Sequence, residues 1–304
     1  MRTLQNLTNR LTKTVVPTAR RRTSQRSQPT EALEERVLLS NVTVNFTGGD
    51  LVLQGDSDDN KVSVEQVANG IQVTGHSGTT INGRLSMLIR AVSVPDDLRA
   101  NFSAGGNNTL AVENLVVGDD VQYRGGRGRE SFAVIEGEVR GDVNIRTGNG
   151  ADAAVLSSVL MDGEIAINTG SGSDRVVVGG EEISADININ TGRGRDDVFL
   201  ASMSAGDVVV KTGGGNDIAF IVQVEADEMN MNMGGGNDEV AMGEVDVSAR
   251  MTVKGGGGSD NYETIAVSAG DERVSQFEGN TVTGLDDRIE DLSADLEIIF
   301  AELA

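Results

Sequence analysis

The chain has no cysteine, no tryptophan, a single histidine, three prolines and only 3% aromatic residues. Without cysteine it cannot form disulfides or thiolate metal sites. Its one histidine, His76, falls in a His-Ser-Gly turn, so ordinary Ser-His or Cys-His catalytic arrangements hardly exist. No apolar run is long enough for a transmembrane helix. We therefore expect a protein without enzymatic activity and without a membrane span, whose thin core is built from Val, Ile, Ala and Met.

Basic residues are also scarce: 25 Lys and Arg stand against 47 Asp and Glu, for a net charge of −22. The imbalance is uneven along the chain. Residues 1–40 carry eight basic and three acidic side chains, hence +5, and the remainder carries 17 and 44, hence −27. A body this acidic repels nucleic acid phosphates and anionic membranes, and it attracts cations. We expect no nucleic acid partner.

Glycine is abundant, with 39 residues, and much of it recurs in one six-residue phrase that ends in Asp. The six copies end at steps of 22, 22, 21, 21 and 22 residues, at Asp152, Asp174, Asp196, Asp217, Asp238 and Asp260. Earlier equivalents end in Glu130 and Asn108. A fixed period of this length marks a stacked repeat. The sequence therefore contains about eight coils.

Apolar residues alternate with polar ones on both sides of each phrase, as in Val143-Asn-Ile145 before Asp152 and Ala154-Val-Leu156 after it. This period of two indicates two strands per coil, each with one buried face. One more apolar residue per coil predicts a short third side; these residues are Leu160, Ile183, Met203, Val224 and Val245. The gaps are so short that each strand can pair only with its equivalent in the next coil. An all-β, parallel β-solenoid of β-helix or β-roll type follows; a β-sandwich is the alternative.

The flanking regions differ in composition from the repeats. We expect a disordered basic leader over residues 1–40, an irregular β cap over 41–97, the solenoid over 98–284 and a C-terminal amphipathic helix over 285–304. The helix is indicated by Leu285, Ile289, Leu292, Leu296, Ile299, Phe300 and Leu303, which recur at helical spacing. We interpret it as a helix that caps the solenoid; the alternative is a C-terminal secretion signal.

The leader ends in Leu33-Glu-Glu-Arg-Val-Leu-Leu-Ser40. This segment resembles the Leu-Glu-Pro-Arg-x-Leu-Leu-Ser motif near the start of many surface and secreted proteins of planctomycete bacteria, although Glu35 stands in the place of the proline. The resemblance implies export and a location outside the cell or at its surface. A short amphipathic helix with Leu33 and Val37 on one face is the alternative interpretation.

The repeated phrase resembles the Gly-Gly-x-Gly-x-Asp-x-U-x nonapeptide of the repeats-in-toxin (RTX) family, where U is a large apolar residue. In that family the Asp carboxylate and the turn carbonyls bind Ca²⁺ between successive turns. The family phrase recurs every nine residues, whereas here it comes once per 21–22 residues, so only one edge of the solenoid can match. The implied ligands are the six repeat Asp residues, with Gly150, Gly172, Gly194, Gly215 and Gly236 in the turns.

The residues make a case for calcium without the resemblance. Stacked coils bring one Asp above the next at about 4.8 Å, where like charges repel. Ca²⁺ takes carboxylate and carbonyl oxygens, and turn glycines let carbonyls converge. The alternative is that each Asp binds the backbone N–H groups of its own turn.

We expect an exported, non-catalytic, calcium-stabilised solenoid with a structural or adhesive role. The alternative is a β-helix that binds or cleaves polysaccharides. The polar face that carries Asn144, Asn188 and Asn230 suits cell-surface glycans or proteins as partners.

Overall fold

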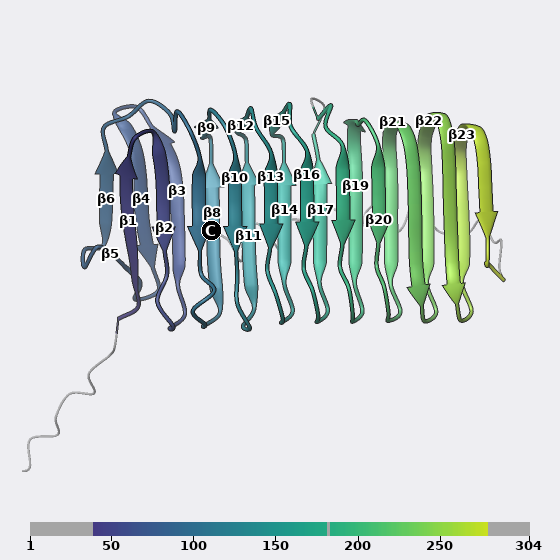
Figure 1. Cartoon of the computed structure of the whole chain (residues 1–304), viewed down its shortest axis with the longest axis horizontal. Coiled ribbons are helices and arrows are strands. Elements are labelled where there is room, and N and C mark those ends of the chain that lie inside the picture. Colours follow the sequence, from purple (N-terminus) through teal and green to yellow (C-terminus); the bar gives the residue numbers. More distant parts are fainter. Residues whose placement is uncertain (1–38, 181–182, 279–304) are drawn as a thin grey trace, which may run out of the picture. The chain divides into compact units, whose positions relative to one another are not determined.

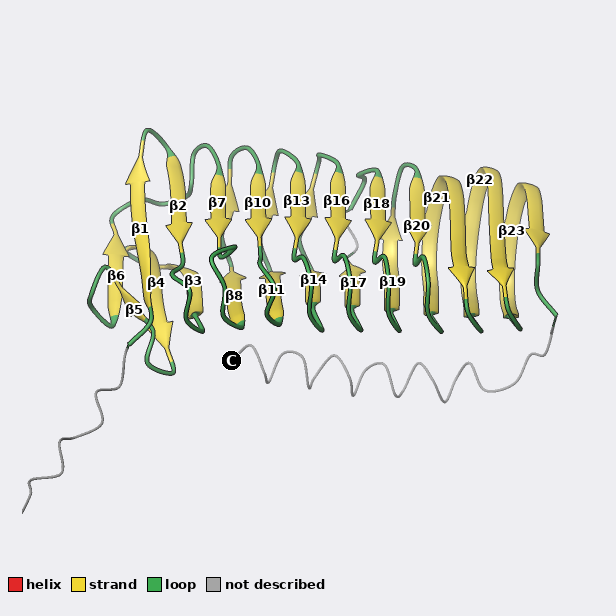
Figure 2. Ribbon diagram, turned by 60° about the horizontal axis from the view of Figure 1, so that its bottom comes forward, coloured by secondary structure: helices red, strands yellow, loops and turns green. Residues whose placement is uncertain are grey.

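A computed structural model describes residues 39–180 and 183–278 of the 304-residue chain. These residues form 23 strands, and they contain no helix, so none that could cross a membrane. The expected leader, except for its last two residues, and the expected C-terminal helix lie outside the described residues. The strands stack side by side along one axis, as Figures 1 and 2 show.

Each regular coil has three sides. The first side is formed by β7 (Leu98–Asn101), β10 (Val121–Arg124), β13 (Val143–Arg146), β16 (Ile165–Asn168), β18 (Ile187–Asn190) and β20 (Val208–Lys211). The second side follows the glycine turn and contains β8 (Asn108–Glu113), β11 (Glu130–Ile135), β14 (Ala153–Ser157), β17 (Arg175–Gly179) and β19 (Asp197–Ser204). The short third side contains β9 (Val116–Val117), β12 (Glu138–Val139) and β15 (Leu160–Met161). In the last coils the sides merge into long bent strands, β21 (Ile218–Gly235), β22 (Glu239–Gly257) and β23 (Asn261–Ser275).

Every strand of the repeats pairs in parallel with its equivalent one coil away. Val143 lies opposite Ile165, Ile165 opposite Ile187 and Ile187 opposite Val208, without a slip in register. The second side keeps the same order, from β11 through β14, β17 and β19 to β21. The prediction of a parallel β-solenoid of about eight coils is confirmed, and the β-sandwich is wrong.

The interior is filled by the apolar columns that the alternation predicts. Ile145 and Ile167 on the first side, and Leu156 and Val178 on the second, are at most 2% exposed and belong to one continuous core. The third side differs in one detail: Leu160 is 41% exposed, because its neighbours Val159 and Met161 turn inward instead. A two-residue strand has room for only one inward side chain, and here Met161 takes that place.

A second apolar cluster lies on the outward face of the second side. It is formed by Ala133, Val155, Val177, Phe199, Phe220 and Ala241, one residue per coil, each flanked in sequence by two residues that point into the core. The rings of Phe199 and Phe220 stack with centroids 5.6 Å apart. We call this set the outward apolar row.

The cap over residues 41–97 is a set of hairpins that covers the edge of the first coil. Its strands are β1 (Asn41–Thr47), β2 (Asp50–Gln54), β3 (Lys61–Val67), β4 (Gly70–His76), β5 (Thr80–Ile81) and β6 (Ser86–Ile89). β1 pairs with β2, and β3 with β4, in antiparallel fashion. β2 then adds in parallel to β7, and β3 to β8. Both exposed edges of the first coil are therefore paired, which prevents recruitment of other chains.

Candidate functional site: an inner ladder of aspartates

The six repeat aspartates lie just before the strands of the second side, where the chain has turned through the glycine phrase. They point inward and are only 0–2% exposed. We call this column, which consists of Asp152, Asp174, Asp196, Asp217, Asp238 and Asp260, the inner Asp ladder. The structure therefore brings together all six predicted Asp residues, but it places them inside the wall of the solenoid and not on an open edge.

The predicted turn glycines are adjacent to the ladder, and they permit its close stacking. Gly172 and Gly194 have φ of +146° and +144°. A Cβ atom on Gly194 would come within 1.3 Å of the carbonyl oxygen of Gly172 in the preceding coil. The same holds for Gly215 and Gly236, at 1.3 and 1.4 Å, and for Gly150, at 2.1 Å. No side chain fits at this place, so the turns can stack only as glycine.

One oxygen of each ladder carboxylate holds the preceding coil. The Oδ1 atom of Asp174 accepts a hydrogen bond of 2.9 Å from the backbone N–H of Asp152. Asp196, Asp217, Asp238 and Asp260 repeat this contact with the preceding Asp at 2.8–2.9 Å, and Asp152 does so with Glu130. The alternative of backbone capping is thus found in altered form, because the N–H group belongs to the neighbouring coil and not to the residue's own turn.

The second oxygen has no such partner in five consecutive coils. The Oδ2 atoms of Asp174, Asp196, Asp217, Asp238 and Asp260 are buried and make no hydrogen bond of ordinary length among the described residues. The Thr147 hydroxyl donates to Oδ2 of Asp152 at 2.7 Å. The equivalent hydroxyls of Thr169, Thr191 and Thr212 are close enough to lower the pKa of Asp174, Asp196 and Asp217, whereas Asp238 and Asp260 have Met233 and Gly255 in the place of the threonine. In the next coils the threonine hydroxyl donates to a carbonyl one coil further on, as from Thr169 to Thr191 O at 3.3 Å. A buried polar atom without a partner is costly.

Burial dominates the electrostatics of the ladder. Loss of solvation raises the pKa of Asp196 and of Asp238 to about 6, and the neighbouring carboxylates add to the effect. Burial likewise raises the pKa of Asp152, Asp174 and Asp217, while hydrogen bonds from the backbone N–H groups and from the hydroxyls of Thr147, Thr169 and Thr212 lower it. The ladder therefore favours any species that neutralises its charge, either a proton or a bound cation.

The first two coils show what occupies the position when Asp is absent. Asn108 is buried, and its amide nitrogen donates to Gly105 O at 3.0 Å and to Glu130 Oε1 at 3.1 Å. The carboxylate of Glu130 also accepts from the Tyr123 hydroxyl at 2.7 Å and from the Gly126 N–H at 3.0 Å. Both side chains are satisfied by the protein itself. The side-chain amide of Asn108 donates a hydrogen bond to a carbonyl oxygen of its own turn. An ionised Asp carboxylate has no hydrogen atom with which to make this bond.

The chemical type of the ladder oxygens is the one that calcium prefers, since the buried Oδ2 atoms of Asp174 to Asp260 are hard oxygen ligands. Among the described residues, however, three acidic side chains bring oxygens within 4.8 Å of one another at Asp97, Asp119 and Asp120 and not in the inner Asp ladder. Asp152 contributes less, because Thr147 already occupies its Oδ2. A calcium ion bound to the inner Asp ladder would neutralise the charge of the carboxylates and would have no catalytic role.

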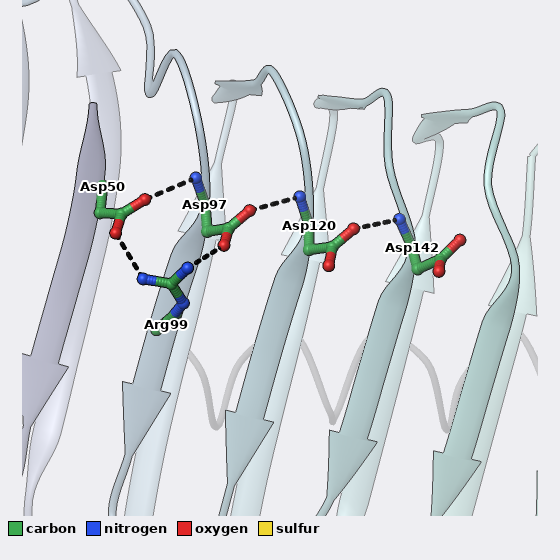
Figure 3. A network of polar contacts seen from close by, with 5 residues as sticks. All are labelled: Asp50, Asp97, Arg99, Asp120 and Asp142. Carbon is green, nitrogen blue, oxygen red and sulfur yellow. Dashed lines mark hydrogen bonds and ion pairs between the residues drawn. The ribbon is translucent and has the colours of Figure 1, made fainter. Parts of the chain in front are cut away.

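A second acidic ladder, which the sequence reading missed, precedes the first side. Figure 3 shows that Asp50, Asp97 and Asp120 each accept a hydrogen bond from the backbone N–H of the next residue in the column, at 3.3, 3.0 and 2.9 Å. Arg99 forms ion pairs with Asp50 and Asp97. These carboxylates hold the following coil, opposite to the inner ladder. The recurrence of acidic residues directly before each first strand, at steps of 21–23 residues from Asp97 onward, was the available signal.

Asp97, Asp119 and Asp120 bring one carboxylate oxygen each within 4.8 Å of one another. The pKa of Asp119 is raised, chiefly by the charge of Asp120. Asp97 is already committed to Arg99 and to the N–H of Asp120.

The sequence predicts a turn at His76, and this prediction is wrong: His76 is the last residue of β4, and the turn begins at Ser77. Its Nε2 lies 2.8 Å from the Ser63 hydroxyl in the cap. This pair is part of the β3–β4 hairpin.

Comparison of the chain with protein-family models, with curated proteins and with solved structures gives no match. The class of protein is therefore defined by the fold alone, as an all-β parallel β-solenoid.

Proposed function

We propose that this protein is an exported, non-catalytic β-solenoid, stabilised by calcium, that serves a structural or adhesive role at the cell surface. The observation that supports the calcium part is the run of five buried Oδ2 atoms without a hydrogen bond of ordinary length, from Asp174 to Asp260; the last two of these, Asp238 and Asp260, have no threonine beside them. The structural role is supported by in-register stacking from coil to coil, which gives a stiff scaffold with long flat faces. Export is supported by the resemblance of residues 33–40 to a surface-protein motif.

The sequence predicts a C-terminal capping helix over residues 285–304, which lies outside the described residues; we propose that this helix covers the outward apolar row and not the end of the stack. The seven apolar residues between Leu285 and Leu303 need a partner surface, and the outward apolar row is of matching character. A helix of 20 residues is about 30 Å long. The row crosses six coils at about 4.8 Å per step, or about 24 Å, so the two lengths agree.

Calcium binding is tested by titration calorimetry on the full chain at pH 7.5. We expect binding of several ions, with fewer bound by the Asp196→Asn and Asp217→Asn variants. Asp207→Asn is the matched control, since Asp207 is exposed and lies outside both the inner Asp ladder and the cluster of Asp97, Asp119 and Asp120. Absence of calcium binding to the parent would remove calcium from the proposal, and turnover of a polysaccharide would replace the non-catalytic role with the enzymatic alternative.

A polysaccharide-binding role is a second candidate, favoured by one specific observation. A shallow groove crosses the outward face of the first side and is lined by Asn144, Arg146, Asn168, Asn188, Asn190 and Lys211. Its polar side chains point away from the core on four neighbouring strands.

A further inference from the structure

The outward face of the first side carries a row of cations and amides that is free of acidic residues. The last outward position of each strand is occupied, coil by coil, by Arg124, Arg146, Asn168, Asn190, Lys211, Asn232 and Lys254. All seven are exposed. We call this set the basic–amide row. Its composition is opposite to that of the body, where acidic residues outnumber basic ones by 44 to 17 beyond residue 40.

The four cations of the row are unpaired within the described part of the chain. Some other surface cations have carboxylate partners, for example Arg140 with Glu138 and Arg273 with Asp271. Neither an ion pair nor a side-chain hydrogen bond is made by Arg124, Arg146, Lys211 or Lys254 to any described residue. In so acidic a protein, unpaired cations in one line form a local anion-attracting stripe. The nearest acidic column, the second acidic ladder, lies at the start of the same strands, four residues before the basic–amide row, as Asp142 does before Arg146. At about 3.3 Å per residue this is about 13 Å, beyond the 8–10 Å over which charges act at physiological salt.

The neighbouring row of the same face is neutral and partly apolar. It contains Asn144, Ala166, Asn188, Val209 and Asn230, which alternate between amide and small apolar side chains. Amides both donate and accept hydrogen bonds, as sugar hydroxyl groups require. Ala166 and Val209 offer small apolar patches on which a sugar ring can lie. The groove at Asn144, Arg146, Asn168, Asn190 and Lys211 joins the two rows into one surface.

From this geometry we infer that the groove binds a linear anionic polysaccharide, with sugar units that carry carboxylate or sulfate groups. The strands repeat at about 4.8 Å, close to the length of one pyranose unit, so a chain laid along the solenoid axis meets one side chain per sugar. Arg and Lys pair with the acidic groups, and the amides bind hydroxyl groups. A single-stranded nucleic acid fits less well, because no aromatic residue lies in either row to stack its bases. The inference deepens the proposed adhesive role, on which it rests, by naming the class of partner.

The test uses the full chain and three polymers: polygalacturonate, dextran sulfate and neutral dextran. Binding is measured by biolayer interferometry at 50 and 300 mM NaCl, with calcium chelated so that ion bridging cannot contribute. We expect both anionic polymers to bind and the neutral one to bind at least about tenfold more weakly. Affinity for the anionic polymers falls at the higher salt concentration, because exposed charge pairs are screened.

Matched variants locate the site. Asn190→Asp places a carboxylate in the middle of the row without a change in volume, and Arg146→Gln with Lys211→Gln removes two cations. Each variant is expected to weaken binding about tenfold. Asn216→Asp makes the same change in an exposed turn residue whose oxygen accepts from the backbone N–H of Asn237, so it serves as the control and retains parental affinity.

Three results would overturn the inference: parental affinity in Asn190→Asp and the double variant, equal binding of neutral dextran, or tighter binding of single-stranded DNA. Circular dichroism confirms that each variant keeps its strands, so a loss of binding is not a loss of fold. If the parent binds none of the polymers, the inference fails while the proposed scaffold role stands. If the parent cleaves the polygalacturonate, the proposed non-catalytic function fails instead.

Discussion

At the residue scale, the inner Asp ladder combines two requirements that conflict. The backbone N–H at each ladder position needs an acceptor, and the Oδ1 atom of the next Asp supplies it. In five of the six coils the same carboxylate leaves its Oδ2 atom buried without a hydrogen bond of ordinary length among the described residues. At the equivalent position, both side-chain atoms of Asn108 are hydrogen-bonded: its Oδ1 accepts from the backbone N–H of Asn60, and its Nδ2 donates to the carbonyl oxygen of Gly105. The six later coils carry Asp where Asn108 shows that an amide also fits, and this difference is what the proposed calcium binding sets out to explain.

The raised carboxylate pKa values predict an unusual pH dependence. In the unfolded chain an Asp titrates near 4, whereas burial raises the folded pKa of Asp196 and Asp238 to about 6. Between these values the folded state binds more protons, so the free energy of unfolding falls as pH rises from about 4 to 6. A displacement of this size corresponds to on the order of 2–3 kcal/mol per group.

Urea denaturation in chelator at pH 5.0 and pH 7.5 measures this effect. The parent is expected to be more stable at pH 5.0, and Asp196→Asn is expected to lose part of the difference while it folds normally. Asp207→Asn, in the exposed second acidic ladder, is the control and keeps the parental pH dependence. A parent that is more stable at pH 7.5 contradicts the assignment of raised pKa values.

The turn glycines predict a sharp contrast between two neighbouring positions. Gly194→Ala puts a methyl group 1.3 Å from Gly172 O at φ +144°, so we expect a loss of about 3 kcal/mol or more. Gly214→Ala meets only Gly235 O at 3.9 Å, with no positive φ, and is expected to be neutral or slightly stabilising. Thermal melting of the two variants checks this, and equal melting temperatures would count against close stacking of the turns.

At the scale of elements, the strands followed from sequence with little error. The phrase fixed the register, and the period-two columns fixed which residues face the core, as for Ile167 and Val178. The prediction that Leu160 faces the core was wrong, because both residues of the two-residue strand β15 are apolar and the sequence does not indicate which of them turns inward. The sequence predicted that the six Asp residues form a column, but it did not predict that they are buried. The glycine pattern is the same whether the Asp after the turn points into the core or toward solvent. The direction of its hydrogen bonds depends on the three-dimensional stacking of coils.

The outward apolar row predicts coupling between two second-side strands. Phe199 on β19 and Phe220 on β21 are 6% and 8% exposed, and their rings are nearly parallel at 4°. Each Phe→Ala change is expected to cost about 3 kcal/mol, with a coupling of about 0.5–1.5 kcal/mol between them. A double-mutant cycle by urea denaturation measures the coupling. Strict additivity of the two losses would show that the rings do not stack.

At the scale of the whole chain, two acidic ladders join the coils in opposite directions. The inner ladder ties each coil to the preceding one, and the ladder that contains Asp97, Asp120 and Asp142 ties each coil to the following one. The cap closes one end of the stack through β2 and β3. Both ladders concentrate negative charge, so the free energy of the stack depends on what neutralises that charge.

The central claim is that calcium neutralises the inner Asp ladder of the folded protein, and the most direct test is thermal melting at pH 7.5 with calcium and with chelator. An ion that binds only the folded state adds about 2.7 kcal/mol at 100 times its dissociation constant. We predict a higher melting temperature for the parent with calcium, and a smaller gain for Asp196→Asn and Asp217→Asn, which melt at or above the parent in chelator because buried charge has been removed. A parent whose melting temperature is the same with calcium and with chelator would contradict the claim.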